Sequence, residues 1–271
     1  MQRISTAETS SSGGGSQTLL RGLDVIEAVG EAPVALAELS ERLGLAKSTT
    51  YRLATALVDR GYLAFTPRLG YRLGPKLLAL GHLAQAQTDL IQVARAHIEA
   101  LAASTDDTVH LGVLDDDQAL YLDKIAGRRR INISSRVGDR HPLTSTGLGK
   151  ALMLDHPADY WAARLQAEQR RDAEGGSGLW HGRMQGYVEA GHAFDLEENE
   201  DQIRCVAAPI RGAQGSIVGA ISVSSAAQYM SDDRIAALSS DVRATAEAIS
   251  RDLGWSDETG ERRRAERLTA K

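Results

Sequence analysis

Two stretches in the C-terminal half of the sequence place polar groups where a small ligand could bind. The turn from Thr144 to Lys150, TSTGLGK, precedes a short predicted helix over 151–154. Backbone N–H groups at the start of a helix lack partners within it, and they favour a small anion. Ser222 and Ser224 lie two residues apart in a predicted strand, so both hydroxyls face the same side. Buried hydroxyls need partners, which here are either hydrogen bonds within the sheet or a bound ligand.

The sequence lacks the residue patterns that are typical of catalysis. The turn ending in Gly149 and Lys150 is similar to a phosphate-binding loop, but Thr144 replaces its first glycine and Ala151 its final serine or threonine. No G-x-S-x-G or H-E-x-x-H pattern occurs, and the seven histidines show no metal-ligand spacing. Cys205 lies in an apolar stretch, as buried core cysteines do. We therefore predict no enzyme, no cofactor and no bound metal.

The stretch 36–53, LAELSERLGLAKSTTYRL, has the spacing of a helix-turn-helix motif. Its apolar residues repeat with a helical period on both sides of Gly44: Leu36, Leu39, Leu43, Leu45 and Leu53. Gly44 suits the left-handed backbone that ends a first helix. The side chains predicted to face DNA are Lys47, Ser48, Thr49, Tyr51 and Arg52, whereas Thr50 turns inward. The alternative is an ordinary helical hairpin without a nucleic-acid partner.

The residues around this motif extend it into a winged helix. A predicted helix over 18–29 offers an apolar stripe that packs on the motif. The stretch 62–73 alternates like a hairpin, and Arg68 at its tip would reach a phosphate or the minor groove. Seven basic residues and one acid lie between Arg42 and Lys76, although the whole chain has a net charge of −5. A local basic patch of this kind holds phosphates without binding every polyanion.

The remaining sequence predicts an α/β domain preceded by a linker helix. The linker, whose helix covers 76–87, has more apolar surface than a bare connection needs, so we expect it to form a dimer contact. The other predicted elements are helices over 89–104 and 231–253, strands over 108–114, 118–125, 131–137, 203–209 and 217–224, and irregular helical residues over 156–192 around a loop at 175–178. Aspartates 115–117 are expected to form a hairpin turn rather than a metal site. Arginines 128–130 are interpreted as a solvated loop or a dimer salt-bridge site.

These elements predict an α+β chain with two domains. The 271 residues, of which 42% are hydrophobic and 25% charged, have the composition of a globular protein. The expected segments are a disordered N-terminus at 1–17, a winged helix-turn-helix DNA-binding domain at 18–74, the linker helix at 75–88, an effector-binding domain at 89–254, and a charged C-terminal tail at 255–271. A single cysteine, no apolar signal core and no membrane-spanning run predict a cytoplasmic protein without a membrane partner.

Taken together, the motifs resemble those of the IclR family of transcriptional regulators. The resemblance is carried by LGLAKSTTYRL, GYRLGPKLLALG, VHLGVLDDDQALYLDKI, SRVGDRHPLTSTGLGKALM, GHAFDLEENEDQIRCVAAPI and GAISVSS, in the family's order over 18–254. It implies a winged helix-turn-helix, a linker helix and a GAF-like effector-binding domain. It also implies a homodimer or homotetramer that binds double-stranded operator DNA and a small organic acid effector. The ligand contacts that it implies are the Gly147 and Leu148 amides and the side chains of Asp195, Cys205, Ser222 and Ser224.

Several residues limit what the resemblance implies about the ligand. Asp195 would repel a bare carboxylate, so we expect it to accept a hydrogen bond from a ligand hydroxyl, which favours a hydroxy or sugar acid. Gln202 and Thr144 depart from a glycine and a histidine that are common in the family, so no particular effector carries over. A zinc ion, which some family members hold, would lack a third ligand beside Cys205 and Asp195. We expect a repressor of a catabolic operon. The alternative is a sensor or enzyme module whose helix-turn-helix mediates protein contacts.

Overall fold

The structure is a computed structural model whose described residues are 13–30, 32–129, 133–168 and 176–256. The chain divides between Thr88 and Asp89 into two compact units. Most of the N-terminal segment expected to be disordered, most of the charged tail and Arg130 of the predicted arginine loop lie outside the described residues. Among the described helices, none combines the length and the apolar character needed to span a membrane.

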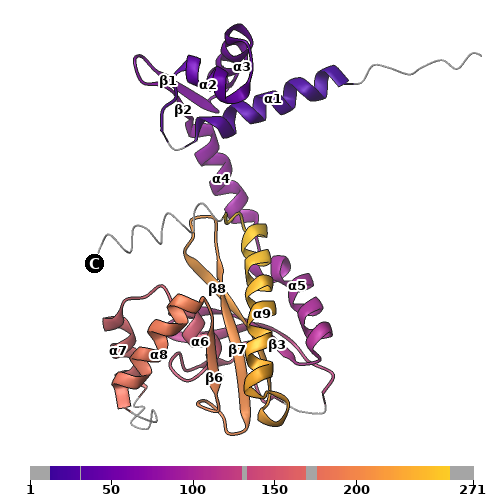
Figure 1. The fold of residues 1–271 in the computed structure, drawn as a ribbon, viewed down its shortest axis with the longest axis vertical. Coiled ribbons are helices and arrows are strands. Elements are labelled where there is room, and N and C mark those ends of the chain that lie inside the picture. The colour runs from indigo at the N-terminus through magenta and orange to yellow at the C-terminus, as the bar shows by residue number, and fades with distance from the viewer. Residues whose placement is uncertain (1–12, 31, 130–132, 169–175, 257–271) are drawn as a thin grey trace, which may run out of the picture. The chain divides into compact units, whose positions relative to one another are not determined.

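The N-terminal unit is the predicted winged helix followed by one further helix (Figure 1). Its elements are α1 (Gly13–Val29), α2 (Leu36–Leu43), α3 (Lys47–Asp59), β1 (Leu63–Thr66), β2 (Gly70–Leu73) and α4 (Pro75–Gln87). All of α1, α2 and α3 contribute to one small core, in which Val25, Leu39 and Ala54 are completely buried. Because α1 begins at Gly13, residues 13–17 are helical, and the prediction that they are disordered was wrong.

Two glycines allow the tight turns of this unit. Gly44 ends α2 in the predicted left-handed conformation, with φ of 60°. Gly70 has φ of 104°, and a Cβ at this position would come within 2.2 Å of the Val34 carbonyl oxygen. Val34 pairs with Tyr71, so the segment before α2 lies against the wing strand β2. A glycine at position 70 therefore lets the wing pack closely on the helix-turn-helix.

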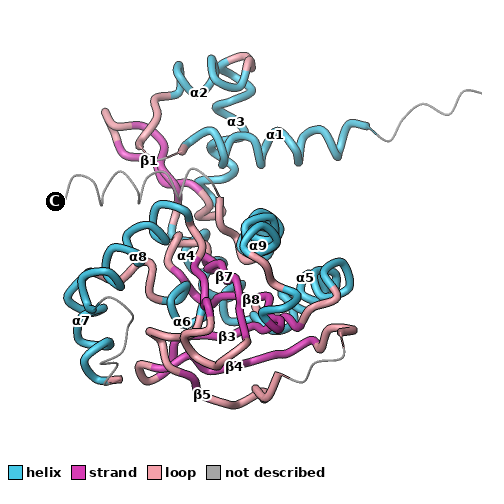
Figure 2. Tube along the Cα trace, turned by 60° about the horizontal axis from the view of Figure 1, so that its bottom comes forward, coloured by secondary structure: helices cyan, strands magenta, loops and turns pink. Residues whose placement is uncertain are grey.

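The C-terminal unit is built on a six-stranded antiparallel sheet in the order β5-β4-β3-β8-β7-β6 (Figure 2). The strands are β3 (Thr108–Asp115), β4 (Gln118–Ile125), β5 (Arg140–His141), β6 (Ala193–Leu196), β7 (Ile203–Arg211) and β8 (Ile217–Ala226). The helices are α5 (Leu90–Thr105), α6 (Gly147–Leu152), α7 (Ala158–Ala167), α8 (Gly176–Ala190) and α9 (Asp232–Asp252), with a short 3-10 turn at Ala227–Tyr229. Asp116 and Asp117 form the predicted β3–β4 turn with positive φ angles.

Helices cover both faces of this sheet. The first face packs on α5 and α9, and its strands contribute Val109, Leu111, Val206, Ile221 and Val223 to a large apolar core. The opposite face packs on α6, α7 and α8 through smaller strand residues, among them Ala207 and Ala220. Successive residues of a strand point to opposite faces, so the polar residues between those of the first core face α6. We call this second side the α6 face.

The predictions fail mainly at the edges of the sheet. The prediction of a strand over 131–137 was wrong for residues 133–137, which are not in a strand, and residues 131–132 lie outside the described residues. Pairing resumes only at the two-residue strand β5. The edge strand β6 was not predicted. The ligand-site helix α6 begins at Gly147 rather than Ala151, and the loop expected at 175–178 is part of α8 from Gly176 onward.

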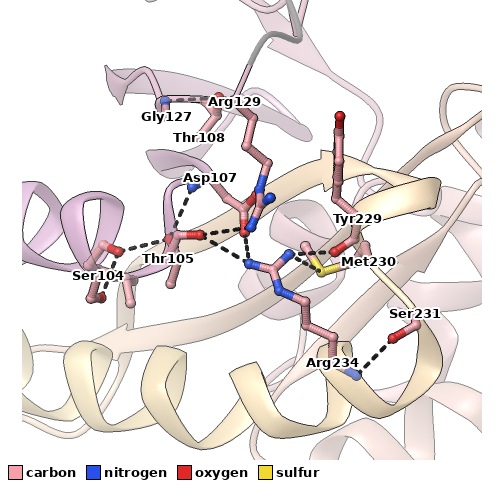
Figure 3. Close-up of polar contacts among 11 residues, drawn as sticks. Ser104, Thr105, Asp107, Thr108, Gly127, Arg129, Tyr229, Met230, Ser231 and Arg234 are labelled. Atoms are coloured by element: carbon pink, nitrogen blue, oxygen red, sulfur yellow. Dashed lines mark hydrogen bonds and ion pairs between the residues drawn. The ribbon is translucent and has the colours of Figure 1, made fainter.

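A buried ion-pair cluster connects the α5–β3 corner with the start of α9 (Figure 3). The Asp107 carboxylate is completely buried and pairs with two guanidiniums, that of Arg129 through Nε at 2.7 Å and that of Arg234. Both arginines also donate to the Thr105 carbonyl oxygen, and the Arg129 guanidinium lies 4.9 Å from the centre of the Tyr229 ring. The interpretation of Arg129 as a solvated or dimer-contact residue was therefore wrong, since its ion pair lies within the chain.

Candidate functional site

The polar side of α3 faces solvent. Of the residues predicted to contact DNA there, Lys47, Ser48, Tyr51 and Arg52 are exposed and Thr49 is half-buried. Thr50 is completely buried, and its hydroxyl donates to the Ala46 carbonyl oxygen at 3.3 Å. The predicted inward orientation of Thr50 is confirmed, and the remaining side chains form one accessible surface on a rigid helix.

The cations of this surface are not neutralised within the described part of the chain. Lys47, Arg52 and the wing-tip residue Arg68 form no ion pair or side-chain hydrogen bond with another described residue. Arg42, in contrast, donates to Glu38 at 2.7 Å and to the Ala28 carbonyl at 2.8 Å. Uncompensated lysines and arginines are the groups that displace counterions from nucleic-acid phosphates. Arg42 is therefore a structural residue of the basic segment.

Backbone N–H groups add to this surface at the start of α3. The N-cap of α3 is Ala46, which has no side-chain cap, so the first N–H groups of α3 lack a capping acceptor. Such N–H groups, with the positive end of the helix dipole, favour a phosphate. At the wing tip, Arg68 is exposed and has φ of 70°, in the left-handed region. The exposed cations therefore lie on two separate elements, α3 and the wing.

The residues predicted to bind a small ligand converge on the α6 face of the C-terminal sheet. Asp195 of β6 is the register partner of Cys205 of β7, which in turn is the register partner of Ser224 of β8. Ser222 lies two residues from Ser224 and faces the same side. A Cβ on Gly147 would come within 2.5 Å of the Cys205 Sγ atom, which places the start of α6 directly over these strands.

The two serines have unused hydrogen-bonding capacity. Ser222 and Ser224 are 1% and 6% exposed, and neither hydroxyl bonds to another described residue. Hydrogen bonds within the sheet, one of the two alternatives for these serines, do not occur among the described residues. Buried hydroxyls without partners are costly, which favours the other alternative, a ligand or ordered water.

The turn before α6 offers fewer free N–H groups than the sequence suggested. The Glu168 carboxylate accepts from the Leu143 and Thr144 amides at 2.8 and 3.1 Å and also from the Thr144 hydroxyl. The Gly149 N–H donates to the Thr146 hydroxyl. The prediction of a whole turn of free donors was therefore wrong. Among the described residues, no hydrogen bond occupies the amides of Ser145, Thr146, Gly147 and Leu148, so these remain available to a ligand.

Burial controls the charges at this site. The Asp195 carboxylate is 4% exposed, and burial raises its pKa to about 6 although Lys150 and two backbone donors oppose the shift. Burial also raises the pKa of the Cys205 thiol to about 12, so the thiol is neutral. Lys150 donates to Glu198 at 2.5 Å and to the Phe194 carbonyl at 2.9 Å. No cluster of three potential metal ligands occurs among the described residues.

Sequence reasoning missed three aromatic side chains that share the α6 face. These are His110 of β3, Tyr121 of β4 and His141 of β5. Alternation in the segment Thr108–Gly112 could have placed His110 beside the serines, whereas His141 depends on a two-residue strand with no sequence signal. Two surface hollows, of about 300 Å³ at Leu114, His156 and Val218 and about 150 Å³ at Arg243 and Trp255, are not lined by the predicted ligand residues.

A winged helix with an unpaired basic recognition surface, together with a sheet that gathers unsatisfied polar groups, is the arrangement of a DNA-binding regulator with a sensor domain. Comparison with known families agrees. The IclR helix-turn-helix domain matches residues 18–67, and the family described as bacterial transcriptional regulator IclR C-terminal matches residues 82–251. The chain belongs to the IclR family of transcriptional regulators, which bind operator DNA and are DNA-binding proteins rather than enzymes.

Individual relatives support this assignment over most of the chain. The HTH-type transcriptional regulator XynR of Escherichia coli K12 is 32% identical over 252 residues, which are 88% of this chain and 98% of XynR. The DNA-binding transcriptional repressor YiaJ of the same strain is 32% identical over 251 residues, 89% of each chain. The crystal structure of Pseudomonas aeruginosa HmgR matches with a TM-score of 0.78 and covers 89% of this chain and 99% of HmgR. At 21% sequence identity, this match supports the assignment of the fold and nothing further.

Proposed function

We propose that the protein is a repressor of a catabolic operon that binds its operator through α3 and the wing and responds to a small hydroxy or sugar acid. The observation that carries the DNA-binding part is the pairing of an uncapped α3 N-terminus with the unpaired cations Lys47, Arg52 and Arg68. In this proposal α3 lies in the major groove and Arg68 contacts the backbone or the minor groove. Repression is supported by similarity to YiaJ, which is named a repressor.

The effector site of this proposal is the cluster on the α6 face. Its ligand contacts are the Gly147 and Leu148 amides and the side chains of Asp195, Cys205, Ser222 and Ser224. A hydroxylated ligand fits because the two serine hydroxyls lack partners among the described residues, and the buried Asp195 carboxylate, on the far side of Cys205 from Ser224, accepts hydrogen bonds. The acid group of the ligand would use the N–H groups left over before α6.

The proposed regulator acts as a homodimer or homotetramer, and α4 is the proposed dimer contact. No residue of α4 is buried, and three of its four leucines are exposed: Leu78 at 79%, Leu83 at 55% and Leu80 at 40%. Exposed apolar side chains in such number on one helix are typical of a surface that another chain covers.

Footprinting tests the DNA-binding proposal. The protein is incubated with DNA from upstream of its own gene, and protection is compared for the wild type, Lys47→Ala and Arg60→Ala. Arg60 is a matched control, because it is an exposed cation at the opposite, C-terminal end of α3. We expect protection by the wild type and Arg60→Ala at concentrations where Lys47→Ala fails. Equal protection by all three proteins would reject α3 as the recognition element.

A further inference from the structure

The three missed aromatic residues continue the polar row of the proposed ligand site across the sheet. His110 is the register partner of Ser222, so β3 and β8 place them side by side on the α6 face. The Tyr121 ring centre lies 4.9 Å from that of His110 and 4.4 Å from that of His141. Each of the six strands thereby contributes a polar side chain to one band of the α6 face, which we call the polar row: His141, Tyr121, His110, Ser222, Cys205 and Asp195, in the order of the sheet. Among neighbours in this band, His110 and Ser222 are register partners, as are Cys205 and Asp195, whereas the others are offset along their strands.

Two ring nitrogens in this row are buried and have no partner. His110 is 1% exposed; its Nε2 atom lies 2.7 Å from the Ser135 hydroxyl oxygen, while its Nδ1 atom has no hydrogen-bond partner among the described residues. The Nε2 atom of His141 is buried and equally without a partner there. Buried polar atoms are almost always satisfied, so these two mark positions where another molecule completes the hydrogen bonding.

The aromatic half of the polar row, formed by His141, Tyr121 and His110, is uncharged. Burial, reinforced by nearby Lys124, lowers the pKa of His110 to about 3, so its ring is uncharged near neutral pH. The Lys124 ammonium is already bonded to the Ile133 and Ser135 carbonyl oxygens, each at 2.7 Å. Uncharged imidazole and phenol groups donate and accept hydrogen bonds without attracting an anion. They therefore suit hydroxyl or carbonyl oxygens better than a carboxylate.

We propose that His110, Tyr121 and His141 bind the hydroxyl groups of a five- or six-carbon hydroxy acid. The inference rests on the proposed effector site, which it extends from strands β6–β8 to β3–β5. Ser222 and Tyr121 lie on strands two apart in the sheet and two residues out of register, which separates them by about 12 Å at the usual strand spacing and rise. A five- or six-carbon chain spans that separation, and a two-carbon acid does not. These three residues therefore select ligands by the length of the carbon chain and by the presence of hydroxyl groups.

Thermal-shift titration tests this assignment with a defined panel of ligands. The probes are D-gluconate, D-ribonate and D-galacturonate, with hexanoate as the length-matched acid without hydroxyls and glycolate as the short one. For the wild type we expect stabilisation by at least one of the three hydroxylated acids, exceeding that by hexanoate and glycolate. For Tyr121→Phe and His141→Gln we expect at least a tenfold weaker apparent Kd for that acid. No preference for the hydroxylated acids in the wild type overturns the proposal.

A matched histidine elsewhere in the domain provides the control. His156 stacks on Tyr160 and lines the 300 Å³ hollow, so His156→Phe should leave the titration unchanged. If His156→Phe weakens binding and the Tyr121 and His141 variants do not, the ligand lies in that hollow and the proposal is wrong. Unchanged ligand binding in Tyr121→Phe and His141→Gln also overturns the proposal, because the ring nitrogens are then hydrogen-bonded by water and not by the ligand.

Operator binding separates this inference from the proposed function. Each variant is assayed on operator DNA without ligand, where we expect wild-type affinity because the residues lie in the sensor domain. If the variants bind operator DNA as the wild type does and keep its ligand selectivity, only the role of the three aromatic residues is rejected. Loss of operator binding by the wild type rejects the regulator proposal itself. Tyr121→Phe removes one oxygen and keeps the ring, so it tests the site even if a histidine variant folds poorly.

Discussion

Gly147 and Cys205 are in direct contact where α6 begins. A Cβ on Gly147 would approach the Cys205 Sγ atom to 2.5 Å. Cys205 in turn is paired in register with Asp195 and Ser224 on its two sides. The absence of a side chain at position 147 therefore determines how closely the turn before α6 approaches the three central strands of the proposed site.

Substitution of Gly147 by alanine should destabilise the protein by about 1–3 kcal/mol, the usual cost of overpacking a core. Gly186→Ala is the control, since it lies in α8 with no atom within 4 Å of an added Cβ, and it should stabilise the protein by up to about 1 kcal/mol. Urea denaturation measures both changes. Adding Cys205→Ala to Gly147→Ala should recover most of the loss; no recovery would contradict a clash with the sulfur.

Removal of the Asp107 carboxylate should be among the most damaging changes in the sensor domain. Asp107→Ala leaves Arg129 and Arg234 without their shared, completely buried partner, and we expect a loss of about 3 kcal/mol in the free energy of unfolding. Asp252→Ala is the control, because its pair with His97 is largely exposed, and it should cost less than about 1 kcal/mol. Similar losses for the two variants in chemical denaturation would show that burial of the cluster contributes little.

Asp195 should make the protein less stable as pH rises from about 4 to 6. Its folded pKa, about 6, lies above the ordinary value of 3.8, so the folded state holds a proton that the unfolded state releases in this window. Asp195→Asn keeps an oxygen for the Glu198 and Asn199 amides and removes the charge. Relative to the wild type it should gain up to about 3 kcal/mol between pH 4 and pH 7. A difference that is constant with pH in denaturation experiments would contradict the raised pKa.

The salt dependence of operator binding should report the wing contact. If Arg68 neutralises one phosphate, Arg68→Ala should lower the slope of log K against log salt by about 1. Arg42→Lys is a useful comparison, since Arg42 is already paired with Glu38 and its charge is kept. Fluorescence anisotropy between low and moderate salt gives both slopes. An unchanged slope for Arg68→Ala would place the wing away from the DNA backbone.

Dimerisation through α4 has an equally direct test. Leu78 is the most exposed of the leucines of α4, and Leu78→Glu should place a charge in the proposed interface and shift the protein towards monomer. Gln85→Glu introduces the same charge on an exposed position of the same helix. Sedimentation velocity should separate the two variants. A Leu78→Glu protein that keeps the wild-type assembly would rule out this side chain as a contact.

Local signals explain what the sequence predicted well. The helix-turn-helix depends on apolar residues three or four apart and on Gly44, and the hairpin of the wing depends on alternation around a glycine turn; all of these act over a few residues. The strands β7 and β8 are long and apolar, and they were predicted nearly in full. Such elements carry their own pattern, which tertiary contacts only complete.

Long-range pairing explains what the sequence missed. The edge strands β5 and β6 have two and four residues, too few for a period to appear, and they exist because neighbouring strands pair with them. The approach of His110, Tyr121 and His141 to one another follows from that pairing. The use of the Leu143 and Thr144 amides by Glu168 depends on the position of the end of α7, which is equally a long-range effect. Of the polar row, only Ser222 was predicted from a strand pattern, Cys205 and Asp195 were implied by the family resemblance, and the three aromatic residues required the sheet order.

Whether α3 reads operator DNA can be measured through the affinity of Arg52→Ala. Binding of the wild type, Arg52→Ala and Arg60→Ala is measured at one salt concentration on the operator and on scrambled DNA of the same length. We predict that Arg52→Ala loses about 1–3 kcal/mol on the operator and little on scrambled DNA, whereas Arg60→Ala changes both affinities slightly and alike. If Arg52→Ala discriminates between operator and scrambled DNA as well as the wild type does, α3 does not read the operator sequence.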